Sequence, residues 1–198
     1  MPKFLVEVGV EDLPAEEAEL IAQSFRDNLL SRLKEARVSH GEAHLFWTLR
    51  RFAILVEDIA ERQEDAVEEI RGPAVSAAFD PQGNLTQAAL GFLRRYGASP
   101  ADLIRKKVGE KEYLFLRLER PGRPTAEILR EIVPVALKAI PCSKSMRWDG
   151  GGSFLRPIRW VVALLDEEVI PLEIAGVRAG RTTFGHRFLS GPVELARP

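Results

Sequence analysis

The sequence has few of the residues on which disulfide-bonded, metal-binding or secreted proteins depend. Among 198 residues there is one cysteine, Cys142, and there are three histidines. One thiol forms no internal disulfide and supplies too few sulfur ligands for a structural zinc site, so we expect no metal site and a reducing, intracellular compartment. The apolar start, residues 4–10, is short and contains Glu7. We therefore expect neither a signal sequence nor a membrane span, and we place the protein in the cytoplasm.

The chain also lacks an excess of charge of one sign. Its 28 Lys and Arg residues are matched by 29 Asp and Glu residues, which gives a net charge of −1. A nucleic-acid site must therefore be a local basic patch. Hydrophobic residues make up 45% and charged residues 29% of the chain. These fractions are typical of globular domains and exclude a disordered or fibrous protein.

The first 70 residues have the periodicities of a β-α-β-β unit. Alternating apolar residues at the start indicate a strand with one buried face, and an apolar stripe at helical spacing follows it. Two further runs rich in β-forming residues then indicate a pair of strands. The expected elements are a strand over 4–10, a helix from Pro14 to about Val38, and strands over 44–49 and 52–59, with Arg50 and Arg51 at the bend.

Residues 71–140 are predicted to be a mixed helix and hairpin segment. The acidic run that precedes it, 57–69, is interpreted as a solvated connection, and the Arg-Gly-Pro sequence at 71–73 ends that pattern. The expected elements are a helix over 86–96 that carries Arg94 and Arg95 near its end and stops at Gly97, a hairpin over 104–119, and a helix over 125–140 that Pro134 bends or divides.

Residues 141–198 are predicted to be a basic, glycine-rich loop followed by a β-rich segment. That segment contains a hairpin made of 160–165 and 169–174, with a third strand over 177–184. The whole chain is therefore expected to have an α+β fold, with antiparallel sheets and helices packed on one face. A single body and two small subdomains both fit this pattern.

The sequence contains no recognisable catalytic constellation. The glycines at 150–152 lack the spacing of a phosphate-binding loop and are interpreted as a turn. Cys142 has no histidine nearby to activate it, so we interpret it as an inert, buried or half-buried thiol. Glu7, Glu11 and Asp12 precede a helix, where acids usually serve the dipole and the cap. We therefore nominate no catalytic residue.

The most unusual segment, 141–159, combines cations, tryptophan and glycines. Guanidinium groups bind phosphates and indole rings stack on unpaired bases, so this segment is a candidate RNA contact. A structural role fits equally, because arginines lean on tryptophan and pair with acids such as Asp149, and so hold a loop against the sheet or a partner chain. Both interpretations stay open. The candidates here are Lys144, Arg147, Trp148, Arg156 and Arg159, and the same question applies to the pairs Arg50–Arg51 and Arg94–Arg95.

Several blocks, taken in order, resemble the N-terminal part of the β subunit of bacterial heterotetrameric (α2β2) glycyl-tRNA synthetase. The opening FLVEVGVEDLP at 4–14 is similar to the family's FLVEIGTEELP, and TLRRFA at 48–53 is similar to its TPRRLA, with Leu49 in place of proline. Residues 71–97 follow its RGP and AFD segment. KSMRW at 144–148, FLRPIRW at 154–160 and GHRF at 185–188 are similar to three further family blocks. The resemblance covers essentially the whole chain.

The resemblance implies a division of labour between two subunits. In this family the α subunit carries glycine, ATP with Mg²⁺ and the adenylation chemistry, whereas the β subunit supplies tRNA recognition and is needed for aminoacylation. The chain is then expected to be the N-terminal portion of the non-catalytic β subunit, with the α subunit and tRNA-Gly as partners. It is expected to hold no cofactor of its own and to be inactive alone.

The resemblance also implies contact residues and a longer parent chain. Arg147, Trp148, Arg156 and Arg159 become candidates for contact with the tRNA acceptor arm or the α subunit, and His186 with Arg187 forms a second candidate pair. Family β subunits are several times longer and bind the anticodon near the C-terminus, so we expect a fragment without anticodon recognition.

Two other hypotheses remain open at this stage. One is a freestanding RNA-binding or protein-docking module with the same fold. The other is an independent enzyme, which would require a nucleophile or metal site that the sequence does not reveal.

Overall fold

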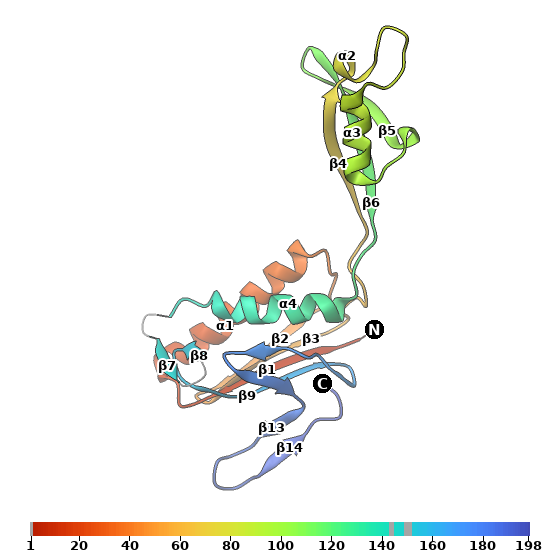
Figure 1. The fold of residues 1–198 in the computed structure, drawn as a ribbon. Coiled ribbons are helices and arrows are strands. Elements are labelled where there is room, and N and C mark those ends of the chain that lie inside the picture. The colour runs from red at the N-terminus through yellow and green to blue at the C-terminus, as the bar shows by residue number, and fades with distance from the viewer. Residues whose placement is uncertain (1, 143–144, 149–151) are drawn as a thin grey trace. The chain divides into compact units, whose positions relative to one another are not determined.

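The chain folds into two compact units. The structure is a computed structural model that describes residues 2–142, 145–148 and 152–198 (Figure 1). Unit 1 comprises Met1–Glu64 and Arg123–Pro198, and unit 2, inserted between these segments, comprises Asp65–Gly122. These bounds follow from contacts in space. The division at residues 70 and 140 was based on local sequence character, and it stays a prediction.

Unit 1 is built on one sheet, which has seven strands among the described residues. These strands are β1 (Phe4–Val10), β2 (Ala43–Thr48), β3 (Arg51–Val56), β9 (Ile158–Leu165), β10 (Glu168–Val169), β11 (Glu173–Ile174) and β12 (Val177–Gly180). Their order is β11-β12-β9-β1-β3-β2, with β10 also paired to β9. The central strand β1 pairs antiparallel with β3 and β9, and Glu7 lies opposite Ala53 and Val162. The β12–β9 pairing is parallel.

Two helices of unit 1 cover the same face of this sheet. Figure 1 shows α1 (Ala15–Glu35) and α4 (Thr125–Lys138) lying together on one side of the strands. Phe4, Val6 and Val8, which alternate along β1, are fully buried in the core that these helices complete. The ring of Phe25 from α1 meets Phe52 from β3 edge-on, with 5.5 Å between the ring centroids. The expected α+β fold, with helices on one face, is confirmed.

Two short hairpins accompany the sheet of unit 1. The strands β7 (Met146–Trp148) and β8 (Gly152–Phe154) form one, and β13 (Thr182–Phe184) and β14 (Pro192–Glu194) form the other. The predicted glycine turn at 150–152 falls largely outside the described residues.

Unit 2 is a small sheet with helices on one face. Its strands are β4 (Ala66–Ala74), β5 (Leu103–Val108) and β6 (Lys111–Arg120), in the antiparallel order β4-β6-β5. Between β4 and β5 lie α2 (Val75–Ala78), α3 (Gln87–Tyr96) and the 3-10 turn η1 (Pro100–Asp102). Its core cluster contains the buried residues Ala78, Ala89 and Leu114. Gly97 ends α3 in the left-handed conformation, as predicted.

Most of the predicted elements are confirmed, with shifts of a few residues at their ends. The strand over 4–10 is β1, the helix that begins near Pro14 is α1, and the hairpin over 104–119 is β5–β6.

The acidic run was not entirely a connection, because its last residues begin β4. Here Glu68 and Glu69 are neutralised within the sheet: Glu68 lies 2.7 Å from the Nε of Arg120, and Glu69 accepts a hydrogen bond from Lys106. The prediction was wrong because so many acidic residues are typical of a solvated connection, whereas the strand β4 depends on pairing with β6, far along the chain.

Pro134 does not divide α4, which continues through it as one helix, and the burial of Val133 and Leu137 on its inner face offsets the missing backbone donor. The bend expected at Pro134 stays a prediction. The strand expected over 169–174 is divided, because β10 pairs with β9 whereas β11 pairs with β12.

The helices in the described part of the chain include none that is long and apolar enough to cross a membrane.

Candidate functional site

Unit 1 has an open cleft of about 880 Å³ on the sheet face opposite the helices. Its walls come from the end of β1, the β2–β3 turn, β9 and the loop between β13 and β14. Five of the residues nominated from the sequence line it: Arg50, Arg51, Arg159, His186 and Arg187. Segments that are far apart along the chain therefore contribute to one site.

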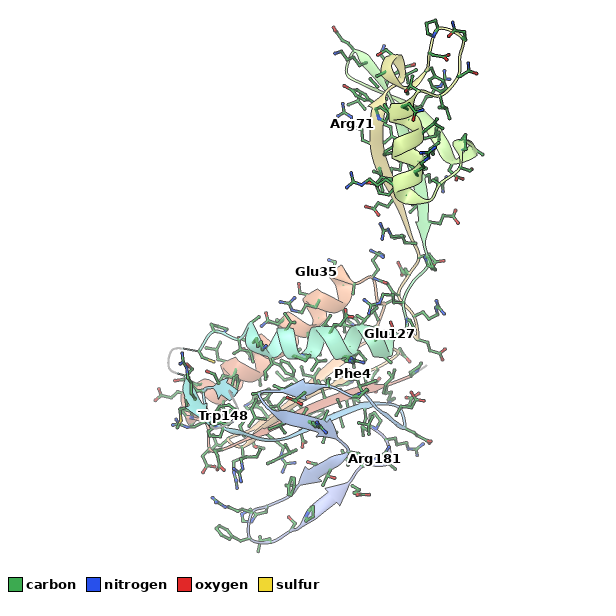
Figure 2. The ribbon with its side chains drawn as sticks, in the orientation of Figure 1. Phe4, Glu35, Arg71, Glu127, Trp148 and Arg181 are labelled. Carbon is green, nitrogen blue, oxygen red and sulfur yellow. The ribbon has the colours of Figure 1, made fainter. Side chains whose placement is uncertain are left out.

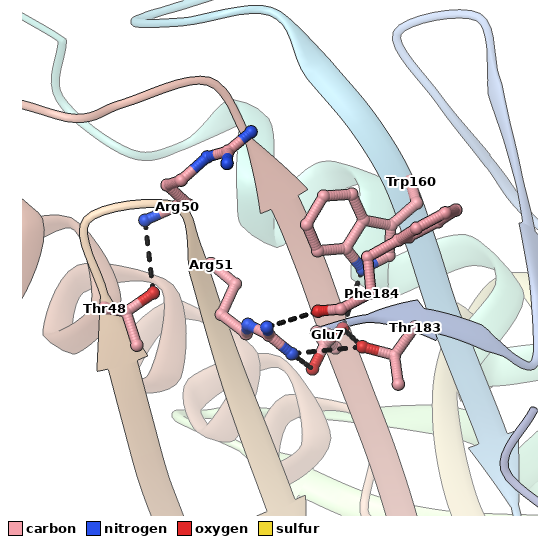
Figure 3. A network of polar contacts seen from close by, with 7 residues as sticks. All are labelled: Glu7, Thr48, Arg50, Arg51, Trp160, Thr183 and Phe184. Carbon is pink, nitrogen blue, oxygen red and sulfur yellow. Dashed lines mark hydrogen bonds and ion pairs between the residues drawn. The ribbon is translucent and has the colours of Figure 1, made fainter. Parts of the chain in front are cut away.

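A buried carboxylate contacts two residues that line this cleft, Arg51 and Trp160. The side chain of Glu7 is on the face of β1 away from the helices and is 7% exposed. It accepts a 2.7 Å hydrogen bond from the indole Nε1 of Trp160 and another hydrogen bond from the hydroxyl of Thr183 (Figure 3). The guanidinium of Arg51 lies 3.5 Å away. A buried charge requires such partners, so Glu7 joins β1, β3, β9 and β13.

A glycine allows the tryptophan to lie against β1. Gly9 pairs with Trp160 across the β1–β9 ladder. A Cβ atom at Gly9 would lie 2.1 Å from two atoms of the indole ring, so a larger residue does not fit unless the ring moves. The Trp160 ring also packs on Phe184, with 5.0 Å between the ring centroids. These contacts place an aromatic wall beside the arginines.

Arg51 is held on several sides at once. It donates a 3.2 Å hydrogen bond to the Thr183 hydroxyl and a second hydrogen bond to the carbonyl oxygen of Phe184 (Figure 3). Its guanidinium carbon lies 5.8 Å from the centroid of Trp160. With so many contacts, Arg51 attaches the β13–β14 hairpin to the sheet.

Arg50 and Arg159 are both oriented by acids that precede α1. The Nε atom of Arg50 lies 3.4 Å from Asp12, and its Nη2 atom lies 3.9 Å from Glu11. The Nε atom of Arg159 lies 3.3 Å from the other oxygen of Glu11. The expectation that these acids cap the helix was wrong: the N-cap residue is Pro14, which makes no side-chain cap hydrogen bond.

The GHRF block forms the outer wall of the cleft. The carbonyl of His186 accepts backbone hydrogen bonds from Leu189 and Ser190, which closes a tight turn. The turn leaves Phe188 84% and Leu189 83% exposed. Among the described residues, Arg187 makes no ion pair, and its guanidinium lies 5.9 Å from the centroid of the Phe188 ring. This turn thus presents one cation and two large apolar side chains.

The remaining nominated residues do not line the cleft. The Nε of Arg156 donates a 3.0 Å hydrogen bond to the carbonyl of Asp12, which does line it. Arg147 and Trp148 lie in β7, where Arg147 is exposed and Trp148 is half-buried against the core. Arg94 and Arg95 are in the last turn of α3 in unit 2. Lys144 falls outside the described residues.

Glu7 was interpreted from the sequence as an acid that serves the helix dipole and cap, and Thr183 was not nominated, so neither was predicted as part of the site. A single acid in an otherwise apolar strand was the available signal for Glu7, because such a charge must find partners when it is buried. Nothing in the local sequence indicates Thr183. Cys142, by contrast, is half-buried as expected, and burial raises the pKa of its thiol, which disfavours the reactive thiolate.

The fold and the cleft define an α+β protein with an arginine-rich, aromatic-walled site, and comparison with known proteins assigns it to a family. The family model described as "Glycyl-tRNA synthetase beta subunit" matches residues 4–198. The chain belongs to this family.

Similar proteins include three glycine--tRNA ligase beta subunits. The one from Myxococcus xanthus is 42% identical over 197 residues, the one from Bacillus subtilis 41% over 196, and the one from Desulforamulus reducens 40% over 197. Each alignment covers 98% of this chain but only 28% or 29% of the relative. The chain thus spans less than a third of the length of these relatives.

Proposed function

We propose that this chain acts as the N-terminal region of the β subunit of a cytoplasmic glycine--tRNA ligase, where it contributes to tRNA-Gly binding and to assembly with the catalytic α subunit. In this proposal the α subunit uses ATP and Mg²⁺ for the glycylation of tRNA. The chain alone is inactive.

The observation that carries this proposal is the turn at 185–190 beside the cleft. Arg187 is free of ion pairs among the described residues, so its charge is available to a phosphate. The adjacent Phe188 and Leu189 are almost fully exposed, as apolar residues at protein interfaces are before the partner binds. We therefore assign Arg187 to tRNA contact and the apolar pair to subunit docking.

The paired arginines have a supporting part in this proposal. Arg50, Arg51 and Arg159 lie within 4 Å of carboxylates, so binding a phosphate would require each to share its charge. In this proposal, the carboxylates instead hold these three arginines in the wall of the cleft beside the turn at 185–190. A freestanding RNA-binding or docking module remains the alternative, and association with the α subunit discriminates between the two.

The first test is light scattering coupled to size-exclusion chromatography. The chain is mixed with the cognate α subunit, with and without tRNA-Gly. We expect co-elution with the α subunit without RNA, and its loss in Phe188→Ala. If the chain associates with neither the α subunit nor tRNA-Gly, the proposal is wrong for this part of the subunit.

A second test addresses the tRNA contact through salt dependence. Arg187→Ala should lower the slope of log affinity against log salt by about one, because one phosphate contact is lost. The matched control is Arg178→Ala, which removes an exposed arginine from β12 of the same unit. Equal effects of both variants would indicate a general charge effect and not a specific contact.

A further inference from the structure

The sheet of unit 2 has one face that its helices leave open. Side chains alternate along the central strand β6: Leu114 and Leu116 are 1% and 0% exposed on the face that packs against the helices. Tyr113, Phe115 and Arg117 project from the other face and are half-buried or exposed. We call this second side the open face.

The open face gathers aromatic rings and cations. Strand register places Arg71 of β4 opposite Phe115 and Lys106 of β5 opposite Tyr113. The guanidinium carbon of Arg71 lies 3.6 Å from the centroid of the Tyr113 ring, and the Lys106 ammonium lies 5.8 Å from that of Phe115. Both rings thus lie on the central strand with a cation from a neighbouring strand over each. Figure 2 labels Arg71 on this unit.

The charges of this face favour an anionic ligand. Lys106 bonds to Glu69 at 2.6 Å, so these two charges offset one another. Arg71 stacks on a ring and, like Arg117, makes no ion pair within the described residues. Besides Glu69 of β4, this face carries the acid Glu119 of β6. A hollow of about 610 Å³, lined in part by Ile104, Arg117 and Glu119, adjoins it.

We propose that the open face of unit 2 binds unpaired nucleotides of RNA. Bases stack on aromatic rings and on guanidinium planes, whereas the nearby cations contact the phosphates. Tyr113 and Phe115 are the stacking residues in this proposal, and Arg71 and Arg117 are the phosphate contacts. Paired RNA presents no free base faces and is expected to bind more weakly here.

This site lies outside the cleft of unit 1 and goes beyond the proposed function. It depends neither on the α subunit nor on recognition of tRNA-Gly as such. An unstructured oligonucleotide therefore tests it separately, because failure of this test leaves Arg187 and the turn at 185–190 unaffected.

The experiment measures fluorescence anisotropy of a labelled oligouridine of about 12 nucleotides, a length that spans a typical single-strand site, with the 198-residue chain. We expect binding that is tighter than for a duplex of the same length. Phe115→Leu and Tyr113→Leu should each weaken it about fivefold or more, because a stacked base is lost. Thermal melting of each variant identifies those that fail to fold.

A matched pair of arginines supplies the control. Arg71 stacks on Tyr113 on the open face, whereas Arg105 lies 4.5 Å from the centroid of Phe79 on the covered face. Arg71→Ala should weaken binding, and Arg105→Ala should leave it within about twofold, because only the former removes a proposed contact. Equal losses would overturn the proposal, since both variants remove the same charge.

Two further measurements keep the proposal falsifiable if the aromatic variants unfold. Arg117 is exposed, so Arg117→Ala should fold and should lower the salt slope by about 0.7, the value for one phosphate of a single strand. Photocrosslinking of 4-thiouridine RNA to the unmodified chain should label residues 111–120. Absence of binding, an unchanged slope, or labelling confined to 184–190 would each overturn the proposal.

Discussion

The two candidate sites hold their arginines in different ways. At the cleft of unit 1, carboxylates hold three of them: Arg51 lies beside the buried Glu7, and Arg50 and Arg159 lie beside acids that precede α1. In unit 2, Arg120 pairs with Glu68, but Arg71 lies on the ring of Tyr113 and Arg105 on that of Phe79. A carboxylate fixes a guanidinium and also cancels its charge, whereas a ring positions the guanidinium and leaves the charge in place.

The two units also differ in how much apolar surface each buries. Unit 1 has a sheet beneath two long helices, and its core cluster includes residues from β1, α1, β3, α4 and β9. Unit 2 has a three-stranded sheet and a cluster based on Ala78, Ala89 and Leu114. We therefore expect unit 1 to be the more stable unit, and unit 2 to open first.

The largest expected effect tests whether the units unfold separately. Phe25→Ala removes a fully buried ring from the core of unit 1 and should reduce the free energy of unfolding by about 4 kcal/mol. In the variant, we expect the NMR signals of β1 to be lost at a lower temperature than in the unmodified chain, whereas those of β5 and β6 are lost at the same temperature in both. An equal shift of both sets of signals would mean that the units unfold as one. The control is Phe46→Ala, at a side chain 57% exposed on β2.

A second prediction concerns the buried carboxylate of unit 1. Glu7→Ala leaves Arg51, Trp160 and Thr183 without their common acceptor and should cost about 3 kcal/mol, as loss of one partner from a buried ion pair does. Chemical denaturation measures the loss, and Trp fluorescence reports the released indole. Glu11→Ala is the control, because its arginine partners are more exposed and its effect should stay below about 1 kcal/mol. Equal effects would mean that Glu7 is not the junction of the strands.

A third prediction compares the loss of stability when alanine replaces two glycines, each of which has an aromatic ring packed against it. A Cβ at Gly9 would lie 2.1 Å from Trp160, and one at Gly72 would lie 2.7 Å from Phe92. Gly9→Ala should cost about 2–3 kcal/mol and Gly72→Ala about 1 kcal/mol, because the Phe92 ring on α3 has to move less. Urea denaturation gives both values. Gly91→Ala is a control, since no atom beyond the adjacent residues and the nearby backbone of its own helix lies within 4 Å of its Cβ position. A smaller cost at Gly9 than at Gly72 would contradict the packing described for the cleft.

The smallest effects are expected from two carboxylates whose titration distinguishes the units. The Lys3 ammonium, by a hydrogen bond and by its charge, lowers the pKa of Glu57 in unit 1, whereas the backbone amide of Asn84 lowers the pKa of Asp80 in unit 2. Because both values are lowered in the folded state, each carboxylate stabilises the fold at neutral pH. That contribution declines as pH falls below the ordinary values of 4.5 and 3.8.

Carbon-detected NMR titration checks this pair of groups. Lys3→Met should raise the pKa of Glu57 toward its ordinary value and leave Asp80 unchanged. Added salt should likewise move Glu57 more than Asp80, because a pair of exposed charges is screened and a hydrogen bond within a turn is not. If Asp80 responds more strongly to salt than Glu57, the assigned causes are wrong.

Local patterns predicted the elements more accurately than their partners. The alternation of 4–10, the stripe of α1 and the turn chemistry of β5–β6 are encoded within a few residues, so periodicity was sufficient for them. The strand β4 was missed in part because its acids find Arg120 and Lys106 only after the chain has folded back. The site shows the same limit: the nominated arginines of the cleft were recognisable, but their carboxylate partners were assigned to helix capping.

The α+β class, the position of most elements, the balance of charges and, through the blocks from residue 4 to residue 188, the family could all be predicted from the sequence. The separate unit at 65–122, the partners of the buried Glu7, and the open face that Tyr113 and Phe115 share with Arg71 became apparent only in the folded chain. The cause is the range over which each interaction acts. Hydrophobic periodicity acts between neighbours along the chain, whereas ion pairs and stacked rings form between residues that only the completed sheet brings together.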